Sequence, residues 1–252
     1  MDSLTGTRVV VTGASSGLGR AMAQALATAG ARVAVTSRSK QRAEAAAHEL
    51  GLNAEGFGLD VRDEQSVTGF VRQASDRFGG IDMLVNNAGI GMRTVNPRFP
   101  GYAQPFWEVS PAGFRDVFET KVTGAFLVGR SVAPLMLEAG SGRIVNISMN
   151  EATMTRRGFV PYGPSGAAVE ALSRVMAADL AETPVTINML LPGGATATGM
   201  IPDEVPAGFR DTLLDPSVMG PPIVWLASRD AEGVRNERIV AADFQDWLAK
   251  RR

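Results

Sequence analysis

The sequence predicts a single α/β domain, built as a doubly wound parallel sheet with helices on both faces. Short, continuously apolar runs alternate with amphipathic segments along most of the 252 residues, a pattern typical of parallel strands covered on both sides. With 45% hydrophobic residues, a chain of this length can bury one large core. We therefore expect residues 1–252 to form one domain.

The N-terminal segment predicts a strand, a tight turn, a helix and a second strand. An apolar run over 8–11 leads into a glycine-rich segment over 12–19, and apolar residues at helical spacing follow over 20–29. Gly30 ends that helix, and the β-branched run over 32–36 reads as the second strand. Together these elements form a βαβ unit, which makes the predicted sheet Rossmann-like.

The alternation continues through the rest of the chain. We expect helices over about 41–50, 63–78, 111–139 and 165–181, and strands over about 55–59, 81–85, 143–147 and 186–190. Pro134 lies inside the third of these helices, and we expect a break or kink there because proline removes a helical hydrogen bond.

Two segments do not follow this rhythm and are expected to be substrate loops over the carboxyl edge of the sheet. They cover about 90–110 and 192–216 and are rich in glycine and proline. Their apolar side chains suggest walls for an apolar ligand, although simple loop packing explains them equally well. These residues are Phe99, Tyr102, Phe106, Trp107, Met200, Ile201 and Phe209.

The amino-acid composition argues against several classes of binding partner. Lys and Arg number 25 against 26 Asp and Glu, so no broad field attracts nucleic acid or an anionic membrane. The chain has no Cys and one His, which argues against disulfides and zinc sites. No apolar run reaches membrane-spanning length, and the first residues do not resemble a signal peptide. We expect a cytoplasmic protein with a small-molecule substrate, no metal, no nucleic acid and no membrane partner.

The glycine-rich segment predicts a dinucleotide site. Gly13, Gly17 and Gly19 let the backbone approach a pyrophosphate, and the following helix begins with unpaired N–H groups and a partial positive charge. Ser15, Ser16 and Leu18 lie in the same turn and are also expected to contact the cofactor. An ordinary tight turn is the alternative explanation, and the strand before and helix after favour cofactor binding.

Several motifs in order along the chain resemble those of the short-chain dehydrogenase/reductase family. They are the glycine-rich segment, Asp60-Val61, Asn86-Asn87-Ala88-Gly89, Tyr162-Gly163-Pro164-Ser165-Gly166 and Pro192-Gly193. The resemblance implies that Asp60 and Val61 contact the adenine and that Asn87, Ala88 and Gly89 lie beside the cofactor. It also implies that Pro192 and Gly193 border the nicotinamide and that Thr198 bonds its carboxamide.

The choice of dinucleotide is predicted from charge. Where many NAD-binding folds carry a carboxylate at the end of the second strand, this chain has Ser37 followed by Arg38. A guanidinium can bind a ribose phosphate through two hydrogen bonds. We therefore expect NADP(H) to be preferred over NAD(H), the alternative being that Arg38 is a solvated loop residue.

The catalytic positions depart from the family pattern. The resemblance implies that Tyr162 is the acid/base, also adjoining the cofactor, but Gly166 stands where the family has Lys. Met149 stands at the family's Ser position and Lys121 at its Asn position, which leaves Ser148 and Asn150 as candidates to orient the substrate oxygen. Because an unperturbed Tyr titrates near pH ~10, Tyr162 needs a nearby cation to act near neutral pH.

Lys121 provides a hypothesis for that cation. If Gly166 leaves a void next to Tyr162, the Lys121 side chain could fill it and act catalytically; alternatively, Lys121 faces solvent or an interface. The resemblance also implies a homodimer or homotetramer, assembled through helices 111–139 and 165–181.

Three functions remain open from the sequence. The first is an NADP(H)-dependent oxidoreductase acting on a carbonyl or alcohol of a small apolar substrate. The second is a repurposed enzyme that performs elimination, hydration or cyclisation in the same pocket. The third is a catalytically silent dinucleotide-binding protein, which the loss of several catalytic residues would permit.

Overall fold

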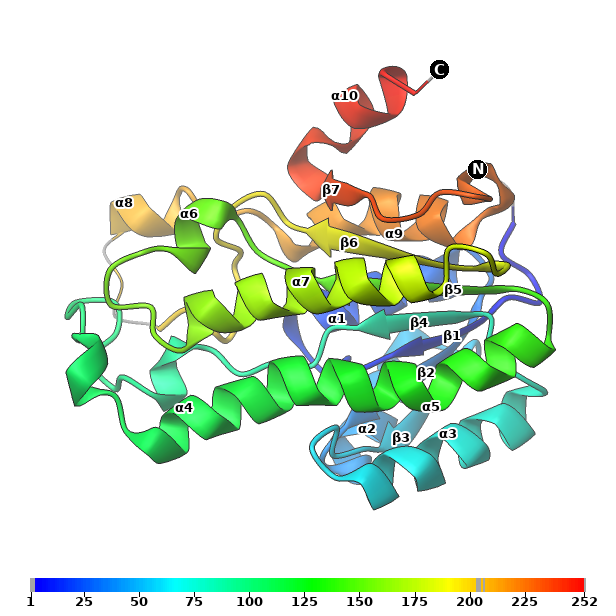
Figure 1. Ribbon diagram of the computed structural model, residues 1–252, viewed down its shortest axis with the longest axis horizontal. Coiled ribbons are helices and arrows are strands. Elements are labelled where there is room, and N and C mark those ends of the chain that lie inside the picture. Colours follow the sequence, from blue (N-terminus) through cyan, green and yellow to red (C-terminus); the bar gives the residue numbers. More distant parts are fainter. Residues whose placement is uncertain (1–2, 203–204, 206, 252) are drawn as a thin grey trace.

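The computed structural model describes residues 3–202, 205 and 207–251, and it contains one seven-stranded sheet (Figure 1). The strand order is β3-β2-β1-β4-β5-β6-β7, and every neighbouring pair is parallel. The order reverses between β1 and β4, which is the topological switch point of a doubly wound sheet. The predicted fold class is confirmed.

The strands and helices have the following bounds. The strands are β1 Arg8–Val11, β2 Arg32–Ser37, β3 Ala54–Gly58, β4 Met83–Asn86, β5 Gly142–Ile147, β6 Val185–Leu191 and β7 Arg238–Val240. The α-helices are α1 Gly17–Thr28, α2 Lys40–Leu50, α3 Glu64–Phe78, α4 Pro111–Phe118, α5 Gly124–Glu138, α6 Glu151–Met154, α7 Tyr162–Asp179, α8 Ala207–Arg210, α9 Gly220–Ala227 and α10 Phe244–Ala249. A π-helical segment, Glu119–Thr123, joins α4 to α5.

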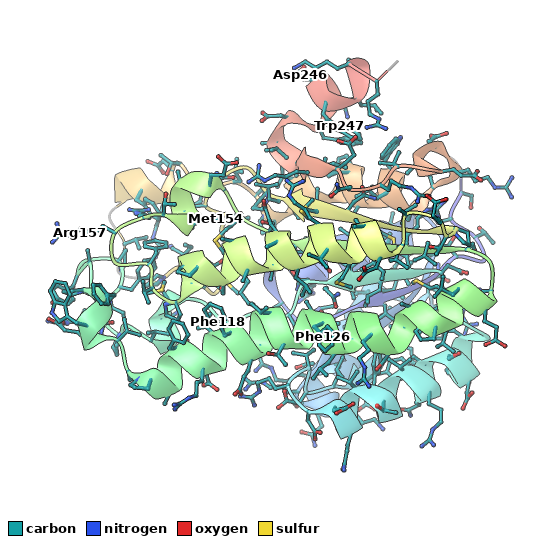
Figure 2. The ribbon with its side chains drawn as sticks, viewed as in Figure 1. Phe118, Phe126, Met154, Arg157, Asp246 and Trp247 are labelled. Carbon is teal, nitrogen blue, oxygen red and sulfur yellow. The ribbon has the colours of Figure 1, made fainter. Side chains whose placement is uncertain are left out.

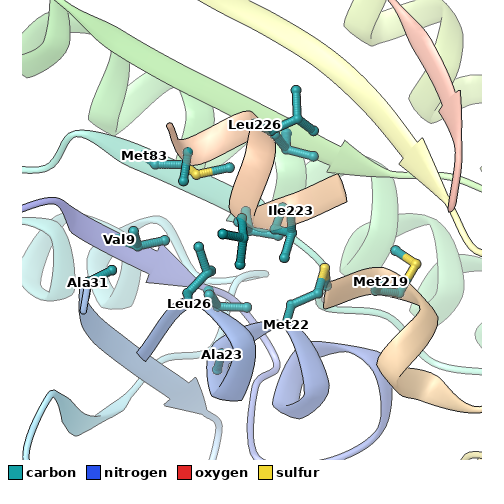
Figure 3. Close-up of a cluster of buried hydrophobic side chains, with 14 of the residues drawn as sticks. Val9, Met22, Ala23, Leu26, Ala31, Met83, Met219, Ile223 and Leu226 are labelled. Carbon is teal, nitrogen blue, oxygen red and sulfur yellow. The ribbon is translucent and has the colours of Figure 1, made fainter. Parts of the chain in front are cut away.

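Helices cover both faces of the sheet because both faces are apolar. On one face, α1 and α9 pack against the strands through side chains such as Met22, Leu26 and Ile223, all fully buried (Figure 3). On the other face, α3, α5 and α7 cover a second core that includes Phe70 and Val132. Burial of this apolar surface is the main stabilising contribution to the layered arrangement.

Local signals explain where several helices begin and end. Asp63 caps α3 by accepting a hydrogen bond from the backbone N–H of Gln65 (2.9 Å), and Gly79 ends it with a left-handed φ of 78°. Ser110 caps α4 in the same way through the N–H of Gly113 (3.0 Å). These caps set the boundaries near those that the sequence predicts.

The predicted helix over 111–139 is interrupted, but not where expected. Helix α5 runs through Pro134, so a break there is ruled out, and the alternative of a kink there stays a prediction. The interruption lies at Glu119–Thr123, where the chain adopts π-helical hydrogen bonding. π-Helical segments are rare in proteins, and many of them lie at functional sites. This one carries Lys121.

The C-terminal quarter holds elements that the sequence pattern did not predict. Strand β7 is three residues long, and α9 and α10 lie beyond the last predicted strand. The predicted loop over 192–216 contains the short helix α8, and its residues 203, 204 and 206 lie outside the described residues.

Helix α7 begins at Tyr162, three residues before its predicted start at Ser165. Among the described helices, none is long and apolar enough to cross a membrane.

Candidate functional site

The predicted site residues gather at the carboxyl ends of the strands, on the left of Figure 1 beside α6 and α8. The glycine-rich segment follows β1, residues 87–89 follow β4, Asn150 follows β5 and residues 192–193 follow β6. In doubly wound sheets this edge, at the point where the strand order reverses, is where ligands bind.

The glycine-rich segment packs directly against the loop after β4. Gly13 and Gly17 have left-handed φ values of 64° and 58°, which only glycine adopts freely. A Cβ added at Gly13 would lie 2.9 Å from Ala88 Cα, and one at Gly19 would lie 2.6 Å from Gly13 O. Larger residues at these positions would therefore push the two loops apart.

Hydrogen bonds fix these two loops together. The Asn87 amide donates to Thr12 O (2.9 Å) and Gly13 O (3.2 Å), while the Thr12 hydroxyl accepts from the backbone N–H groups of Asn87 (2.9 Å) and Ala88 (3.0 Å). Thr36 Oγ1 accepts from Gly13 N at 3.3 Å. Sequence reasoning missed the anchoring contacts of Thr12 and Thr36, because they depend on how the strands pair.

The N-terminus of α1 fits a dinucleotide pyrophosphate. Its N-cap, Ser16, makes no side-chain capping bond, and the first turn carries no acidic residue. Backbone N–H groups of this turn are therefore available to an anion, with the partial positive charge of the helix behind them. The glycines keep the approach free of side chains, so the residues present suit the predicted cofactor.

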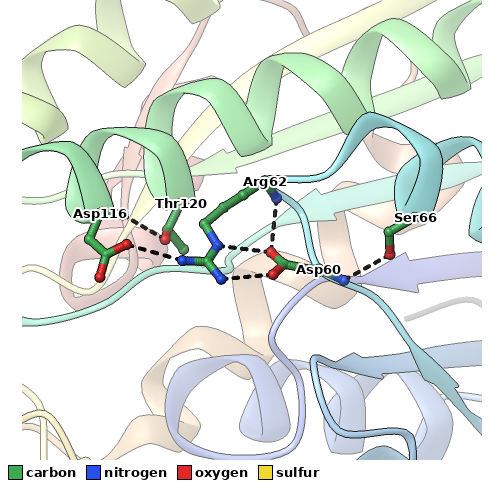
Figure 4. A network of polar contacts seen from close by, with 5 residues as sticks. All are labelled: Asp60, Arg62, Ser66, Asp116 and Thr120. Atoms are coloured by element: carbon green, nitrogen blue, oxygen red, sulfur yellow. Dashed lines mark hydrogen bonds and ion pairs between the residues drawn. The ribbon is translucent and has the colours of Figure 1, made fainter. Parts of the chain in front are cut away.

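The adenine end of the predicted site is an ionic network (Figure 4). Arg62 donates three hydrogen bonds to the Asp60 carboxylate, from its backbone N, Nε and Nη2, at 2.8 to 3.0 Å. It also pairs with Asp116 at 3.1 Å. These hydrogen bonds from Arg62, and more weakly the charge of Arg38, hold the pKa of Asp60 below its ordinary value. Asp60 is thus ionised and keeps one of about four acceptor positions for a ligand.

The residues predicted to select the nucleotide lie close to this network. Ser37 is the last residue of β2, and its carbonyl accepts from Leu59 N (2.8 Å), so the strand end is held beside the loop that carries Asp60. Arg38 follows and is exposed. Its positive charge lies near enough to Asp60 to contribute weakly to the lowered pKa of that carboxyl.

The Lys121 ammonium lies over the face of the Tyr162 ring. The Lys121 ammonium lies 4.5 Å from the centroid of the Tyr162 ring, and its stem packs on Gly89, where an added Cβ would lie 3.2 Å from Lys121 Cγ. Within the described part of the chain, neither Lys121 Nζ nor the Tyr162 hydroxyl has a hydrogen-bond or ion-pair partner. Burial lowers the pKa of Lys121 to about 8 and raises that of Tyr162.

The π-helical turn that carries Lys121 is fixed from both sides. Thr120 Oγ1 donates to Asp116 O (2.7 Å), which ties the turn to the Arg62 network. At its other end, Gly124 lies so close to Val61 that an added Cβ would approach Val61 Cγ2 to 2.7 Å. The predicted adenine contact Val61 therefore also positions the start of α5.

Met149, not Lys121, fills the space beside Gly166. A Cβ added at Gly166 would lie 2.7 Å from Met149 Cε and 2.8 Å from Met149 Cγ. Met149 therefore occupies the space directly next to Gly166, while the space that Lys121 occupies lies against the Tyr162 ring. Lys121 instead reaches Tyr162 from the side of Gly89.

The two candidates for orienting the substrate oxygen have other partners. The Ser148 hydroxyl donates to Glu170 Oε1 (2.5 Å), which also accepts from Arg238 Nε (2.8 Å). The Asn150 amide donates to Gly193 O (2.8 Å) and so links the loops after β5 and β6. Sequence reasoning missed Glu170 and Arg238. Glu170 lies on α7 eight residues after Tyr162, about two helical turns along the same side of the helix. That spacing is the sequence signal that could have identified Glu170.

The predicted substrate loops contact each other over the site. An added Cβ at Gly91 would lie 3.2 Å from Met200 Cγ, and Arg93 Nη1 donates to Gly199 O (3.2 Å). Thr198 lies against Gly17, where an added Cβ would lie 3.4 Å from Thr198 Cβ. The second loop thus places Thr198 directly over the glycine-rich segment.

Comparison with known proteins agrees with this geometry. The model of the short chain dehydrogenase family matches residues 7–206. The chain is 33% identical over 247 residues to 3-oxoacyl-(acyl-carrier-protein) reductase FabG of Vibrio cholerae, covering 94% of this chain and 96% of that protein. It is 36% identical over 196 residues to gluconate 5-dehydrogenase of Gluconobacter oxydans, covering 76% and 72% of the two chains.

Solved structures show the same similarity. A 3-ketoacyl-(acyl-carrier-protein) reductase from Brucella melitensis, crystallised with NADH, superposes with a TM-score of 0.85 at 29% identity, covering 94% of this chain and 97% of that one. The fold, the glycine-rich loop and these matches agree over nearly the whole chain. The chain therefore belongs to the short-chain dehydrogenase family.

Proposed function

We propose that this protein is an NADP(H)-dependent oxidoreductase that interconverts a carbonyl and an alcohol on a small apolar substrate. The observation that carries the proposal is the Lys121 ammonium 4.5 Å from the Tyr162 ring centroid. The Lys121 ammonium supplies a cation next to Tyr162, the one candidate acid/base that matches its position in the family pattern. The family's usual Lys position is Gly166, so the charge comes from a different helix.

A nicotinamide cofactor held at the glycine-rich segment over 12–19 would supply or accept the hydride, and the protein's own residues handle the proton. Because burial raises its pKa, the Tyr162 phenol holds its proton at neutral pH and can donate it to a substrate oxygen. The positive charge of Lys121 then stabilises the phenolate that remains. Asn150, bonded to Gly193 O, positions the loops on either side of the substrate.

The relatives support redox chemistry and leave the substrate class broad. One relative is a 3-oxoacyl-(acyl-carrier-protein) reductase and another is a gluconate 5-dehydrogenase. Apolar residues in the loops over 90–110 and 192–216 favour an apolar substrate, since Phe106, Trp107 and Met200 among them are exposed.

Assembly into a homodimer or homotetramer through α5 and α7 is part of the proposal. Three large apolar side chains are exposed on these helices: Phe126 (44%), Leu137 (41%) and Val175 (60%). Phe126 lies on the outward side of α5, beside α7 (Figure 2). Exposed apolar surface of this kind favours association, and light scattering of the purified protein measures the oligomer.

Consumption of NADPH with a panel of apolar ketones tests the proposed activity. We expect Tyr162→Phe to lower kcat by roughly 100-fold to 10,000-fold, the usual contribution of a positioned acid/base, with a much smaller change in NADPH binding because the ring is kept. Tight NADPH binding by the wild type without turnover on any ketone would contradict the proposal and favour a non-redox enzyme or a silent binding protein.

The nucleotide preference is tested at Arg38. If its guanidinium bonds the ribose phosphate, Arg38→Ala should weaken NADPH binding roughly 10-fold to 100-fold, as expected for hydrogen bonds to a charged group. NADH binding should not change, and Arg42→Ala, on the exposed first turn of α2, serves as the matched control. Equal loss for both nucleotides would show that Arg38 does not read the phosphate.

A further inference from the structure

Lys121 is unusual in this chain because of its residue type as well as its position. Lys and Arg together number 25, yet lysine occurs only at positions 40, 121 and 250. Lys40 is exposed and pairs with Glu44 at 3.6 Å, and Lys250 is exposed near the C-terminus. Arginine cannot lose its proton in proteins, whereas lysine can. The one lysine in the candidate site is therefore its one amine able to act as a nucleophile.

The surroundings of Lys121 suit a free amine. Its nitrogen lies over the Tyr162 ring, without an ion-pair partner in the described part of the chain. The Lys121 side chain lines a small cavity whose other walls are mostly apolar, including Ala88, Ile147 and Val169, with polar side chains from Thr12, Asn86 and Thr120. An unpaired amine in apolar surroundings is the arrangement that activates lysine towards carbonyl groups.

We propose that Lys121 forms a Schiff base with a small ketone or aldehyde bound beside Tyr162. This is an activity separate from hydride transfer, and it needs no nucleotide. It identifies the carbonyl compound, rather than the alcohol, as the ligand class that Lys121 recognises.

The reaction balances without a further reactant. The neutral Lys121 nitrogen attacks the carbonyl carbon, a C–N bond forms, and the carbonyl oxygen takes up a proton to give a carbinolamine. The nitrogen releases its protons as the C–O bond breaks, and one water leaves with formation of the C=N bond. The Tyr162 hydroxyl, which has no protein partner among the described residues, can donate the proton that the departing oxygen needs.

The protonation state of Lys121 supports this role. With its pKa lowered to about 8, about one Lys121 in ten is neutral at pH 7, against about one in three thousand for an ordinary lysine. The neutral fraction is the nucleophilic one. Burial therefore increases the reactive fraction by roughly 300-fold.

The cavity next to Lys121 is large enough for one water. Its volume is about 10 Å³, close to the space that one water requires. Asn86 also lines it, and the Asn86 amide nitrogen already donates to Ala125 O (3.2 Å) and Asn146 Oδ1 (2.9 Å). The Asn86 Oδ1 atom is buried and has no partner in the described part of the chain. An unsatisfied acceptor of this kind favours a water at this position.

Labelling with acetylacetone tests the proposal, since this diketone condenses with neutral lysines to a stable enaminone that absorbs in the near ultraviolet. We expect the full-length protein at pH 7 to gain the mass of one acetylacetone less one water, with peptide mapping placing it on Lys121. The rate at Lys121 should exceed that at Lys40 and Lys250 at least about 10-fold, in line with its larger neutral fraction.

Two matched variants and a second probe complete the design. Lys121→Arg keeps the positive charge but should lose the adduct, whereas Lys40→Arg should label like the wild type. Acetaldehyde with cyanoborohydride, a smaller probe, should alkylate the same nitrogen. Labelling of Lys40 or Lys250 as fast as Lys121, or an unmodified Lys121 with both probes, would overturn the proposal. Because neither probe needs NADPH, these outcomes are separate from those of the reductase assay.

Discussion

Two regions around Tyr162, each called a wall here, differ in chemistry: one faces the Tyr162 ring, and the other adjoins Gly166, four residues further along α7. One wall carries the Lys121 ammonium 4.5 Å from the ring centroid. The other is apolar, with the Met149 side chain seated where a Gly166 Cβ would lie. In the family pattern the cation belongs to the second wall. If the chain keeps the family's chemistry, its cation faces the Tyr162 ring from Lys121, and the Met149 side chain occupies the space next to Gly166.

Removing the charge of the first wall should have the largest effect. We expect Lys121→Met to lower kcat for ketone reduction by about 100-fold, the lower limit for loss of one group that stabilises charge in the transition state. Lys121→Arg should keep most of the activity, because a permanent cation remains. Steady-state kinetics with NADPH measures both variants, and equal losses in both would show that the charge itself does not matter.

The second wall is tested by restoring the family's residues. Gly166→Lys should destabilise the fold by about 1 to 3 kcal/mol, because the new side chain overlaps Met149. Met149→Ser alone should also destabilise it, since it leaves a cavity.

In the double variant each substitution should reduce the destabilisation that the other causes. We expect the double variant Met149→Ser/Gly166→Lys to be more stable than the sum of the single changes by about 0.5 to 3 kcal/mol, the range for contacting residues. Urea unfolding of the four proteins measures this coupling. Additive changes would mean that the two residues do not share one space.

The smallest effect concerns pH. Because the pKa of Lys121 is about 8, its positive charge is present below that pH and is lost as the pH rises through it. Ketone reduction should fall about 2-fold between pH 7 and pH 8 and continue to fall above pH 8, towards the rate of the uncharged Lys121→Met. In Lys121→Arg the decline at this pH should disappear, since arginine stays protonated. A decline at the same pH in both proteins would assign it to another group.

Sequence reasoning predicted the fold and the glycine-rich turn because their signals are local. Apolar periodicity predicts strands and helices, and the glycine positions at 13, 17 and 19 reflect a backbone that must pass close to another loop. The contact of Met149 with Gly166 lacks such a signal, since it joins the end of β5 to α7. The π-helical turn and the three-residue β7 were missed because neither leaves a repeating pattern.

The Arg62 network has a thermodynamic consequence. It joins Asp60, at the predicted adenine contact, through Asp116 to the turn that carries Lys121. Energetic coupling between two sites is reciprocal. If an adenine nucleotide changes the proton affinity of Lys121 through this bridge, protonation of Lys121 must change the nucleotide affinity by the same factor. The pH dependence of nucleotide binding would then report on an amine at the far end of the ligand.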